Sequence, residues 1–365
     1  MTDIKHVIGL CAVLLGASLG SAQAQTPYPI TQGKHYRFEK IADGVYYATP
    51  QAGGINYLFG SNPFLGSNNV VIVNDDDVVV VDTGTTPYAA HAFLDDIRLL
   101  TNKPVRTVIN THWHYDHTDG NSIYGPEVQI IATEFVRQAI LNFDILHNEP
   151  FKMSSNIAGI ALVDDLKKQI AAQTDPARKA ELEKKVAATQ ASMKQFAQDI
   201  KQIKPTPPNV TYTNKMVLYR GKREIDLLFL GRGHTGGDTV VFLPKERIVC
   251  TGDLMESRIA FMGSAFFDEW LTTLDALKRL DFTVDLPGHG APFTDKGLIT
   301  AFQSYLKDVM AQAAKLKAQG VSADDAAKRV DLTAHAKDFP DIQGKGAEVR
   351  GVRRIYAWMD ERGRK

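Results

Sequence analysis

The sequence predicts a folded protein of the α/β class, with strands and helices in separate layers. Of its 365 residues, 44% are apolar and 23% are charged, which is typical of a chain that buries a sizeable core. Short β-branched segments alternate with helical segments, and this order is typical of layered α/β domains. Histidines and aspartates with glycines nearby follow several of these strands. Lys plus Arg and Asp plus Glu number 42 each, so the neutral chain gives no electrostatic support for binding nucleic acid or a membrane surface.

The first residues have the features of an export signal. Lys5 precedes an apolar run from Val7 to Leu19, and the small residues Ala22 and Ala24 follow it. The run is shorter than the about 20 apolar residues that cross a membrane. We therefore expect residues 1–24 to be a signal peptide that is removed when the protein is exported to the periplasm.

The remaining residues, 25–365, are expected to form one domain. Its first half begins with a predicted hairpin. Two β-branched runs span Val70–Val81 around a polar turn at Asn74–Asp77, and Asp82 directly follows the second run. Three further elements are expected here: strands over Val105–Asn110 and Val128–Ala132, and a helix over Glu134–Leu141 with Thr133 as its cap.

The middle of the chain, about residues 158–204, is predicted to be a helical insertion. It is rich in Ala, Lys, Gln and Glu, and apolar residues such as Leu182 and Phe196 recur at helical spacing. Asp175 followed by Pro176 is a helix start signal, so two helices are expected. A helical hairpin packed on the core is the favoured interpretation, and a substrate lid or a dimer contact are the alternatives.

The strand pattern returns in the second half, which we assign to the same domain. Cys250 lies in one of these strands and is expected to be a small buried residue. The predicted strands cover Arg223–Leu230, Thr239–Leu243, Arg247–Thr251 and Phe282–Leu286, and the predicted helices cover Asp268–Leu280, about Lys296–Ala318 and a segment near the C-terminus.

The stretch from Thr111 to Gly120 carries most of the chemistry. It contains His112, His114, Asp116 and His117 directly after a predicted strand. Buried imidazoles and carboxylates need partners, and a metal ion is the partner that fits such a crowded set. Imidazole nitrogens with a carboxylate oxygen suit zinc, although iron or manganese also accept them.

Three later residues have a similar setting. His234, Asp253 and His289 each follow or adjoin a predicted strand and have glycines beside them. A single residue of this kind is explained by a turn or a helix cap. Together with the cluster around His112, they indicate one shared metal site.

The His-x-His-x-Asp-His pattern and these later residues, in this order, resemble the metallo-β-lactamase superfamily. The resemblance covers about residues 40–295 without the helical insertion, and it includes Asp82, which supports the ligands in that family. It implies an αββα four-layer sandwich with a helical-hairpin insertion and with metals at one edge of the sheets. It also implies two zinc ions, with Asp253 bridging them; the ligands of the first are His112, His114 and His234, and those of the second are Asp116, His117 and His289.

Such a site implies a hydrolase that acts on a small molecule. Two metals lower the pKa of a shared water toward about 7, so that a metal-bound hydroxide attacks an acyl substrate such as an ester, lactone or amide. Asp116 is the expected catalytic residue because it can orient the nucleophile and accept its proton. The oligomeric state is left open.

The substrate has alternatives. True β-lactamases of the family carry Cys or Ser at the position of Asp253, but export to the periplasm favours β-lactams, so a metallo-β-lactamase is the second interpretation. A persulfide dioxygenase with one iron is the third, because it shares the histidine pattern. Apolar segments near the metals, Gly54–Leu65 and Ile259–Trp270, together with Trp113 and Tyr115, are expected to line an apolar mouth, although core packing explains Phe266 and Phe267 equally well.

Overall fold

The computed structural model describes residues 28–51, 66–143 and 163–363. Within these ranges, thirteen strands form two sheets. The first sheet has the order β1 (Ile30–Gln32), β2 (Tyr36–Ala42), β3 (Val45–Pro50), β4 (Asn69–Val73), β5 (Val78–Val81), β6 (Val105–Ile109), β7 (Gln129–Thr133) and β8 (Val210–Tyr212). The second has the order β13 (Val284–Pro287), β12 (Ile248–Gly252), β11 (Thr239–Leu243), β10 (Arg223–Phe229) and β9 (Lys215–Arg220).

Both sheets are mixed. The first sheet is antiparallel from β1 to β5 and parallel from β5 to β8. The second sheet is antiparallel from β9 to β12, and β12 and β13 are parallel. Parallel neighbours end at the same edge, so residues that follow β5, β6, β12 and β13 are brought near one another.

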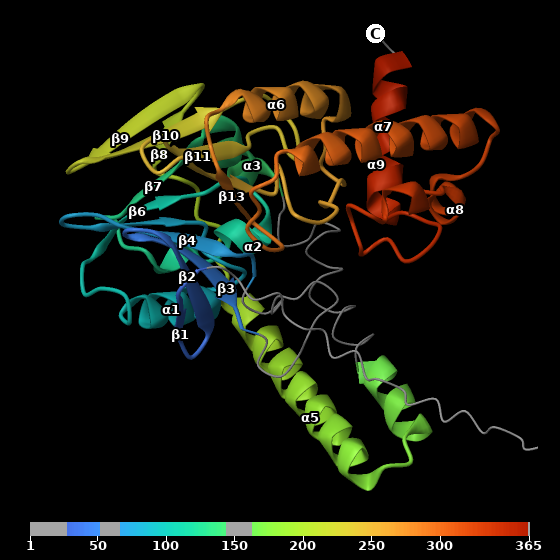
Figure 1. Cartoon of the computed structure of the whole chain (residues 1–365), viewed down its shortest axis with the longest axis horizontal. Coiled ribbons are helices and arrows are strands. Elements are labelled where there is room, and N and C mark those ends of the chain that lie inside the picture. The colour runs from blue at the N-terminus through green and yellow to red at the C-terminus, as the bar shows by residue number, and fades with distance from the viewer. Residues whose placement is uncertain (1–27, 52–65, 144–162, 364–365) are drawn as a thin grey trace, which may run out of the picture.

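Four layers result, as expected from the resemblance (Figure 1). Helix α1 (Pro87–Ile97) covers the outer face of the first sheet, where Phe93 packs against Val80. The inner faces of the two sheets form one core that includes Val79 and Val241. Helices α6 (Phe267–Arg279), α7 (Gly297–Ala318), α8 (Ala323–Arg329) and α9 (Val349–Gly363) lie beyond the second sheet. The αββα prediction is confirmed.

Most predicted elements of the first half are confirmed. The hairpin is β4 and β5, and its valines alternate between the inner core and the face under α1, so both faces of the strands are buried. Helix α3 (Glu134–Asn142) begins as expected, because the Thr133 hydroxyl accepts a hydrogen bond from the Val136 amide. In the second half, β10 to β13, α6 and α7 lie within about three residues of the predicted ranges.

Several elements were not predicted. The hairpin β2–β3 turns at Asp43-Gly44, where Gly44 has φ 68° and Asp-Gly is a strong hairpin signal. The short elements β1, β8, β9, α2 (Tyr115–Thr118) and α8 were also missed, as were three single 3₁₀ turns at Asn121–Ile123, Ile200–Gln202 and Thr333–His335.

The middle of the chain is helical where the structure describes it. One helical stretch covers residues 163–172, and α5 (Pro176–Asp199) extends away from the sheets (Figure 1). The Asp175 side chain caps α5 and Pro176 is its first residue, as expected. Among the side chains of α5 that the structure describes, a narrow set is buried, including Leu182 and Phe196. The predicted signal peptide, residues 1–24, lies outside the described residues, and none of the described helices is long and apolar enough to span a membrane.

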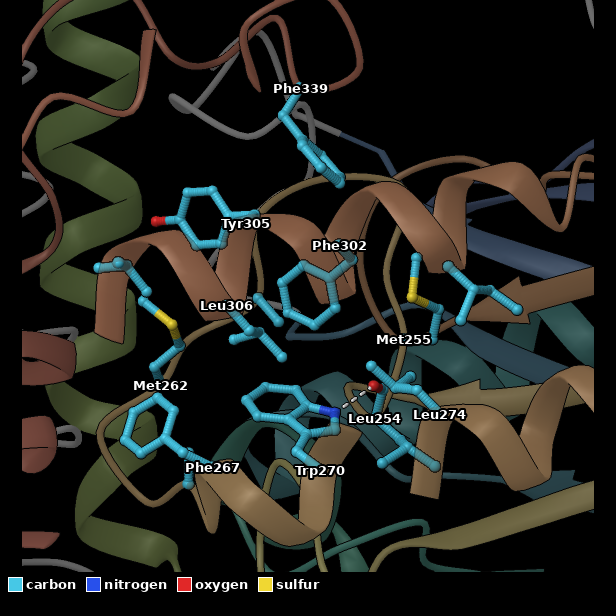
Figure 2. Close-up of a cluster of buried hydrophobic side chains, with 14 of the residues drawn as sticks. Leu254, Met255, Met262, Phe267, Trp270, Leu274, Phe302, Tyr305, Leu306 and Phe339 are labelled. Atoms are coloured by element: carbon cyan, nitrogen blue, oxygen red, sulfur yellow. Dashed lines mark hydrogen bonds between the residues drawn. The ribbon is translucent and has the colours of Figure 1, made fainter. Parts of the chain in front are cut away.

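A large apolar cluster supports the second sheet from outside (Figure 2). Trp270 of α6 is fully buried, packs edge-on against Phe302 of α7 and donates a hydrogen bond to the Leu254 carbonyl. The indole also lies 5.7 Å from the ring of His234, between ring centres. The cluster therefore fixes the segment after β12 and the turn that carries His234.

Candidate metal centre

The seven predicted ligands meet at one edge of the two sheets. Residues 112–117 follow β6, which ends at Ile109, and continue into α2. Asp253 directly follows β12, His289 follows β13 after one glycine, and His234 lies in the turn between β10 and β11. Both sheets therefore contribute to one site.

Two glycines allow the backbones to come this close. Gly252 has φ 53°, a left-handed conformation that directs the chain sharply after β12. At Gly288, a Cβ atom would lie only 2.3 Å from Oδ1 of Asp253 and 2.8 Å from Cε1 of His117. A side chain at Gly288 would therefore occupy the space in which the ligands converge.

The first group of possible metal ligands is His112, His114, His234 and Asp253, all of them buried. Nδ1 of His114 lies 3.0 Å from Nε2 of His112 and 3.0 Å from Nε2 of His234. Oδ2 of Asp253 lies 3.7 Å from Nε2 of His112 and 3.6 Å from Nε2 of His234. Tetrahedral zinc with Zn–N bonds near 2.0–2.1 Å places its nitrogen ligands about 3.3 Å apart, so this spacing fits one ion.

The second group is Asp116, His117 and His289. Oδ2 of Asp116 lies 3.0 Å from Nε2 of His289 and 3.6 Å from Nε2 of His117. Asp253 reaches this group too, since its Oδ1 lies 3.4 Å from Nε2 of His117 and its Oδ2 lies 3.6 Å from Nε2 of His289. Asp253 thus stands between the two groups.

Unsatisfied polar atoms show that these residues fit metal ions. Nε2 of His117 and Oδ1 of Asp253 are buried and lack a hydrogen-bond partner among the described residues. Such atoms cost about 1–3 kcal/mol each when they stay unpaired, and a cation between them removes that cost. Five imidazoles and two carboxylates are a donor set that zinc, iron and manganese accept.

The two groups differ in their protonation. Burial lowers the pKa of all three histidines of the first group, that of His234 to about 4, so they are neutral at neutral pH. Burial also acts to lower the pKa of His117 and His289, but nearby carboxylates, Asp253 foremost, outweigh it and raise both values. The second group therefore carries protons that a metal ion must displace.

Asp82 supports the ligands as the resemblance implies. Its Oδ2 accepts a hydrogen bond of 2.7 Å from Nδ1 of His117, which leaves Nε2 to face the site. The other oxygen, Oδ1, accepts from the Thr111 amide, and the Thr111 hydroxyl lies 3.1 Å from Nδ1 of His112. Asp82 has φ 63°, an uncommon conformation for a residue other than glycine. This strain is tolerated at the position that orients two ligands.

Ser264 is a supporting residue that the sequence did not reveal. Its hydroxyl lies 3.1 Å from Nε2 of His114. His114 presents Nδ1 to the first group, whereas His112 and His234 present Nε2, so the outer nitrogen of His114 needs its own partner. No local sequence pattern marks Ser264 as a partner of His114.

A cavity of about 830 Å³ opens beside the metal ligands. His114, Asp116, Asp253 and His289 are among its lining residues. The lining also includes residues far along the chain, among them the segment 341–348 and Arg350 at the start of α9. The contribution of this C-terminal segment was not predicted.

The predicted apolar mouth is found only in part. Tyr115, Ile259 and Phe261 line the cavity. Trp113 is buried and packs against the ring of His114, and Phe267 belongs to the apolar cluster outside the second sheet. The expected segment Gly54–Leu65 lies outside the described residues.

Known proteins resemble this chain in sequence. A model of the family described as "Metallo-beta-lactamase superfamily" matches residues 62–122, which include the first four ligands. A linear primary-alkylsulfatase of Pseudomonas sp. (strain ATCC 19151) is 22% identical over 300 residues, which cover 76% of this chain and 53% of the relative. A metallo-beta-lactamase type 2 of Bacillus sp. (strain 170) is 32% identical over 93 residues, 24% of this chain and 36% of the relative. The chain thus spans about half or less of the length of these two relatives.

The fold has a counterpart among solved structures. A metallo-beta-lactamase from Pontibacter korlensis superposes with a TM-score of 0.50 at 18% identity, over 75% of this chain and 99% of that one. At 18% identity, this comparison shows a shared fold and no more. Over residues 62–122 the chain is thus similar to the metallo-β-lactamase superfamily, its fold matches that of a metallo-β-lactamase, and two His/Asp groups in it could hold metal ions.

Proposed function

We propose that this protein is a hydrolase with two zinc ions that acts on an acyl substrate, an ester, lactone or amide. The observation that carries the proposal is the position of Asp253, whose carboxylate lies within 3.4–3.7 Å of histidines of both groups. When bound, the two ions polarise the acyl carbonyl and make water a strong nucleophile near neutral pH. Iron or manganese are the other ions that this donor set accepts.

Asp116 is proposed as the residue that orients the attacking water and accepts its proton. Burial acts to raise its pKa, but His117 and His289 outweigh burial and lower the pKa to about 2. Asp116 is therefore a carboxylate at neutral pH, and it lines the cavity. A carboxylate in hydrogen-bond reach of the water is what general base catalysis requires.

The cavity supports a small organic substrate. It has room for a molecule of moderate size, and Phe261 and Ile259 give it apolar surface next to the ligands. We propose no nucleic acid and no membrane as partner, in keeping with the zero net charge. Export to the periplasm with removal of residues 1–24 is part of the proposal. The mass of the intact protein isolated from the periplasm tests it, because it shows whether these residues have been removed.

Sulfate esters are the second candidate class of substrate. The relative described as a linear primary-alkylsulfatase aligns over most of this chain. For this donor set, β-lactam hydrolysis and oxidation of a persulfide by a single iron are the further alternatives. The carboxylate of Asp253 between both groups favours two ions over one.

The test combines metal analysis with a panel of substrates. We expect nearly two zinc equivalents per chain and turnover of aryl esters or lactones above that of aryl sulfates, β-lactams and persulfides. His114→Ala should abolish this turnover. His335→Ala is the matched control, because His335 pairs with Asp308 away from the metal ligands. Turnover in His114→Ala equal to that of the control contradicts the proposal, and a single iron equivalent with persulfide oxidation favours the dioxygenase.

A further inference from the structure

The N-terminal part of α9 packs against the loop that borders the metal ligands. Gly351 lies so close to Met262 that a Cβ atom there would be 3.0 Å from Cε and 3.1 Å from Cβ of Met262. One turn later, Nε of Arg354 donates a 3.0 Å hydrogen bond to the Ala265 carbonyl. In Figure 1, α9 stands against α7 and α8, so the C-terminal helices hold it in this position. A segment far from the ligands in sequence is thus fixed beside them.

The ring of Phe261 lies between Arg350 and two of the metal ligands. Its guanidinium lies over the ring of Phe261, 4.5 Å from the ring centre. The same ring lies 5.6 Å from that of His114 and 6.2 Å from that of His234, between ring centres. The charge of Arg350 therefore lies one aromatic ring away from the first group of ligands. Both Arg350 and Phe261 line the cavity.

Arg350 differs from the other cations that line the cavity. The side chains of Lys328 and Lys345 are 75% and 68% exposed, so their charges are mostly in solvent. Arg258 is paired with Glu256, whose side chain is 1% exposed and needs that partner. These three cations are explained without a ligand.

Arg350 keeps hydrogen-bonding capacity for a ligand. Its side chain is 22% exposed, and Nε donates a 2.6 Å hydrogen bond to Glu348, which also accepts from the Gly351 amide. Among the described residues, its two terminal amino groups have no hydrogen-bond partner. A guanidinium held by Nε and by stacking presents these amino groups in a fixed plane, an arrangement that suits a carboxylate or another planar anion.

We propose that Arg350 binds an anionic group at the end of the substrate that is remote from the bond being broken. This inference rests on the proposed acyl hydrolysis and names a substrate class for it: acyl compounds with a carboxylate at the far end and an apolar linker that lies along Phe261. The carboxylate would accept hydrogen bonds from the terminal amino groups of Arg350. The C-terminal segment then selects the substrate, and the metal ligands perform the reaction.

Kinetics test the proposal with a matched pair of substrates. Mono-4-nitrophenyl glutarate ends in a carboxylate, and the corresponding glutaramate ends in a neutral amide of nearly equal size. We expect the zinc-loaded protein to prefer the glutarate, and Arg350→Gln to reduce that preference about tenfold by lowering kcat/KM for the glutarate more than for the glutaramate. Arg350→Lys should retain part of the preference. Arg353→Gln, which removes the same charge from the same helix but from a pair with Asp324, should retain all of it.

Binding separates the proposal from the proposed reaction. The ligands here are the free compounds glutarate and glutaramate, without the nitrophenyl ester. Each carries one carboxylate that the metals can bind, but only glutarate has a second carboxylate for Arg350. In calorimetric titrations of the zinc-loaded protein, we expect glutarate to bind about tenfold more tightly than glutaramate, and Arg350→Gln to remove the difference. Equal binding of both compounds by the unchanged protein overturns the inference, and so does a preference that survives in Arg350→Gln. Absence of ester turnover together with selective glutarate binding refutes the acyl hydrolase and leaves the anion site supported.

Discussion

The orientation of His114 depends on a hydroxyl group outside the set of metal ligands. His114 turns Nδ1 toward the first group, and its Nε2 faces Ser264 at 3.1 Å. This contact fixes which nitrogen carries the proton and how the ring is rotated. Ser264 is held in turn by its loop, which α9 contacts through Arg354 and Ala265.

Ser264→Ala should therefore weaken zinc binding without disturbing the fold. Loss of a contact of this kind lowers metal affinity by about 10–100-fold, and we expect the lower end because one hydrogen bond is removed. Competition with a chelating dye measures the affinity. Ser304→Ala, at an exposed position of α7, is the control. Equal zinc affinity in the two variants contradicts the role given to Ser264.

The two halves of the site should respond differently to pH. The histidines of the first group have lowered pKa values and are already neutral near pH 7, so zinc binding there displaces few protons. His117 and His289 have raised pKa values, so their protonated fraction falls, and zinc affinity rises, as the pH increases through neutrality. Calorimetric zinc titrations in buffers of different ionisation enthalpy count the protons released. Equal proton release for both zinc equivalents would show that this assignment is wrong.

At the scale of elements, the ends of the strands decide where the ligands lie. β12 ends at Gly252, whose φ of 53° redirects the chain so that Asp253 enters the site. A Cβ atom on Gly252 would lie 2.5 Å from Oγ1 and 2.6 Å from Cβ of Thr111, the residue that hydrogen-bonds Asp82. A change at the end of β12 should therefore displace Thr111, and with it Asp82, which orients the ligand His117.

Gly252→Ala should lower both stability and zinc content. The left-handed backbone alone costs about 1 kcal/mol for alanine, and the clash with Thr111 adds about 1–3 kcal/mol. Gly320→Ala isolates the first contribution, because Gly320 has φ 74° and nothing lies within 4 Å of its added Cβ. Urea unfolding and zinc analysis of both variants make the comparison. A loss of stability at Gly252 no larger than that at Gly320 would remove the proposed coupling.

The sequence predicted those elements whose local pattern is strong. The valines of β4 and β5 are buried on both faces, and Thr133 and Asp175 cap their helices as their positions indicate. The hairpin β2–β3 could also have been found, because Asp43-Gly44 is a turn signal between alternating apolar residues. The short strands β1 and β8 span three residues each, which is too few for a periodic pattern.

At the scale of the whole molecule, the sequence predicted the residues that form the two His/Asp groups but not the surroundings of these groups. His112 to His117 form a compact motif, and the later ligands follow strands in an order that the family pattern specifies. Ser264 and Arg350 have no such mark, because their roles arise from tertiary packing of a loop and α9. Local sequence patterns predict strands, helix caps and the spacing of ligands. Contacts between segments that are distant in sequence depend on how the sheets and helices pack together.

The metal ions should also hold the two sheets together. His112, His114, Asp116 and His117 follow a strand of the first sheet, whereas Asp253 and His289 follow strands of the second. Ligands that are buried together favour the folded state by mass action, about 2.7 kcal/mol for each ion at a free concentration one hundred times its Kd. Removing the ions should therefore lower the free energy of unfolding of the whole domain.

We expect excess EDTA to lower the Tm of the zinc-loaded protein by about 5–10 °C, and added zinc to restore it. Differential scanning calorimetry measures both changes on one sample. Asp253→Asn is the informative control, because the carboxylate between the two groups is replaced by a neutral amide and EDTA should then have a much smaller effect. Since the ligands join both sheets, the shift should appear in a single cooperative transition. A zinc-loaded protein whose Tm is indifferent to EDTA would show that the ions do not link the two sheets.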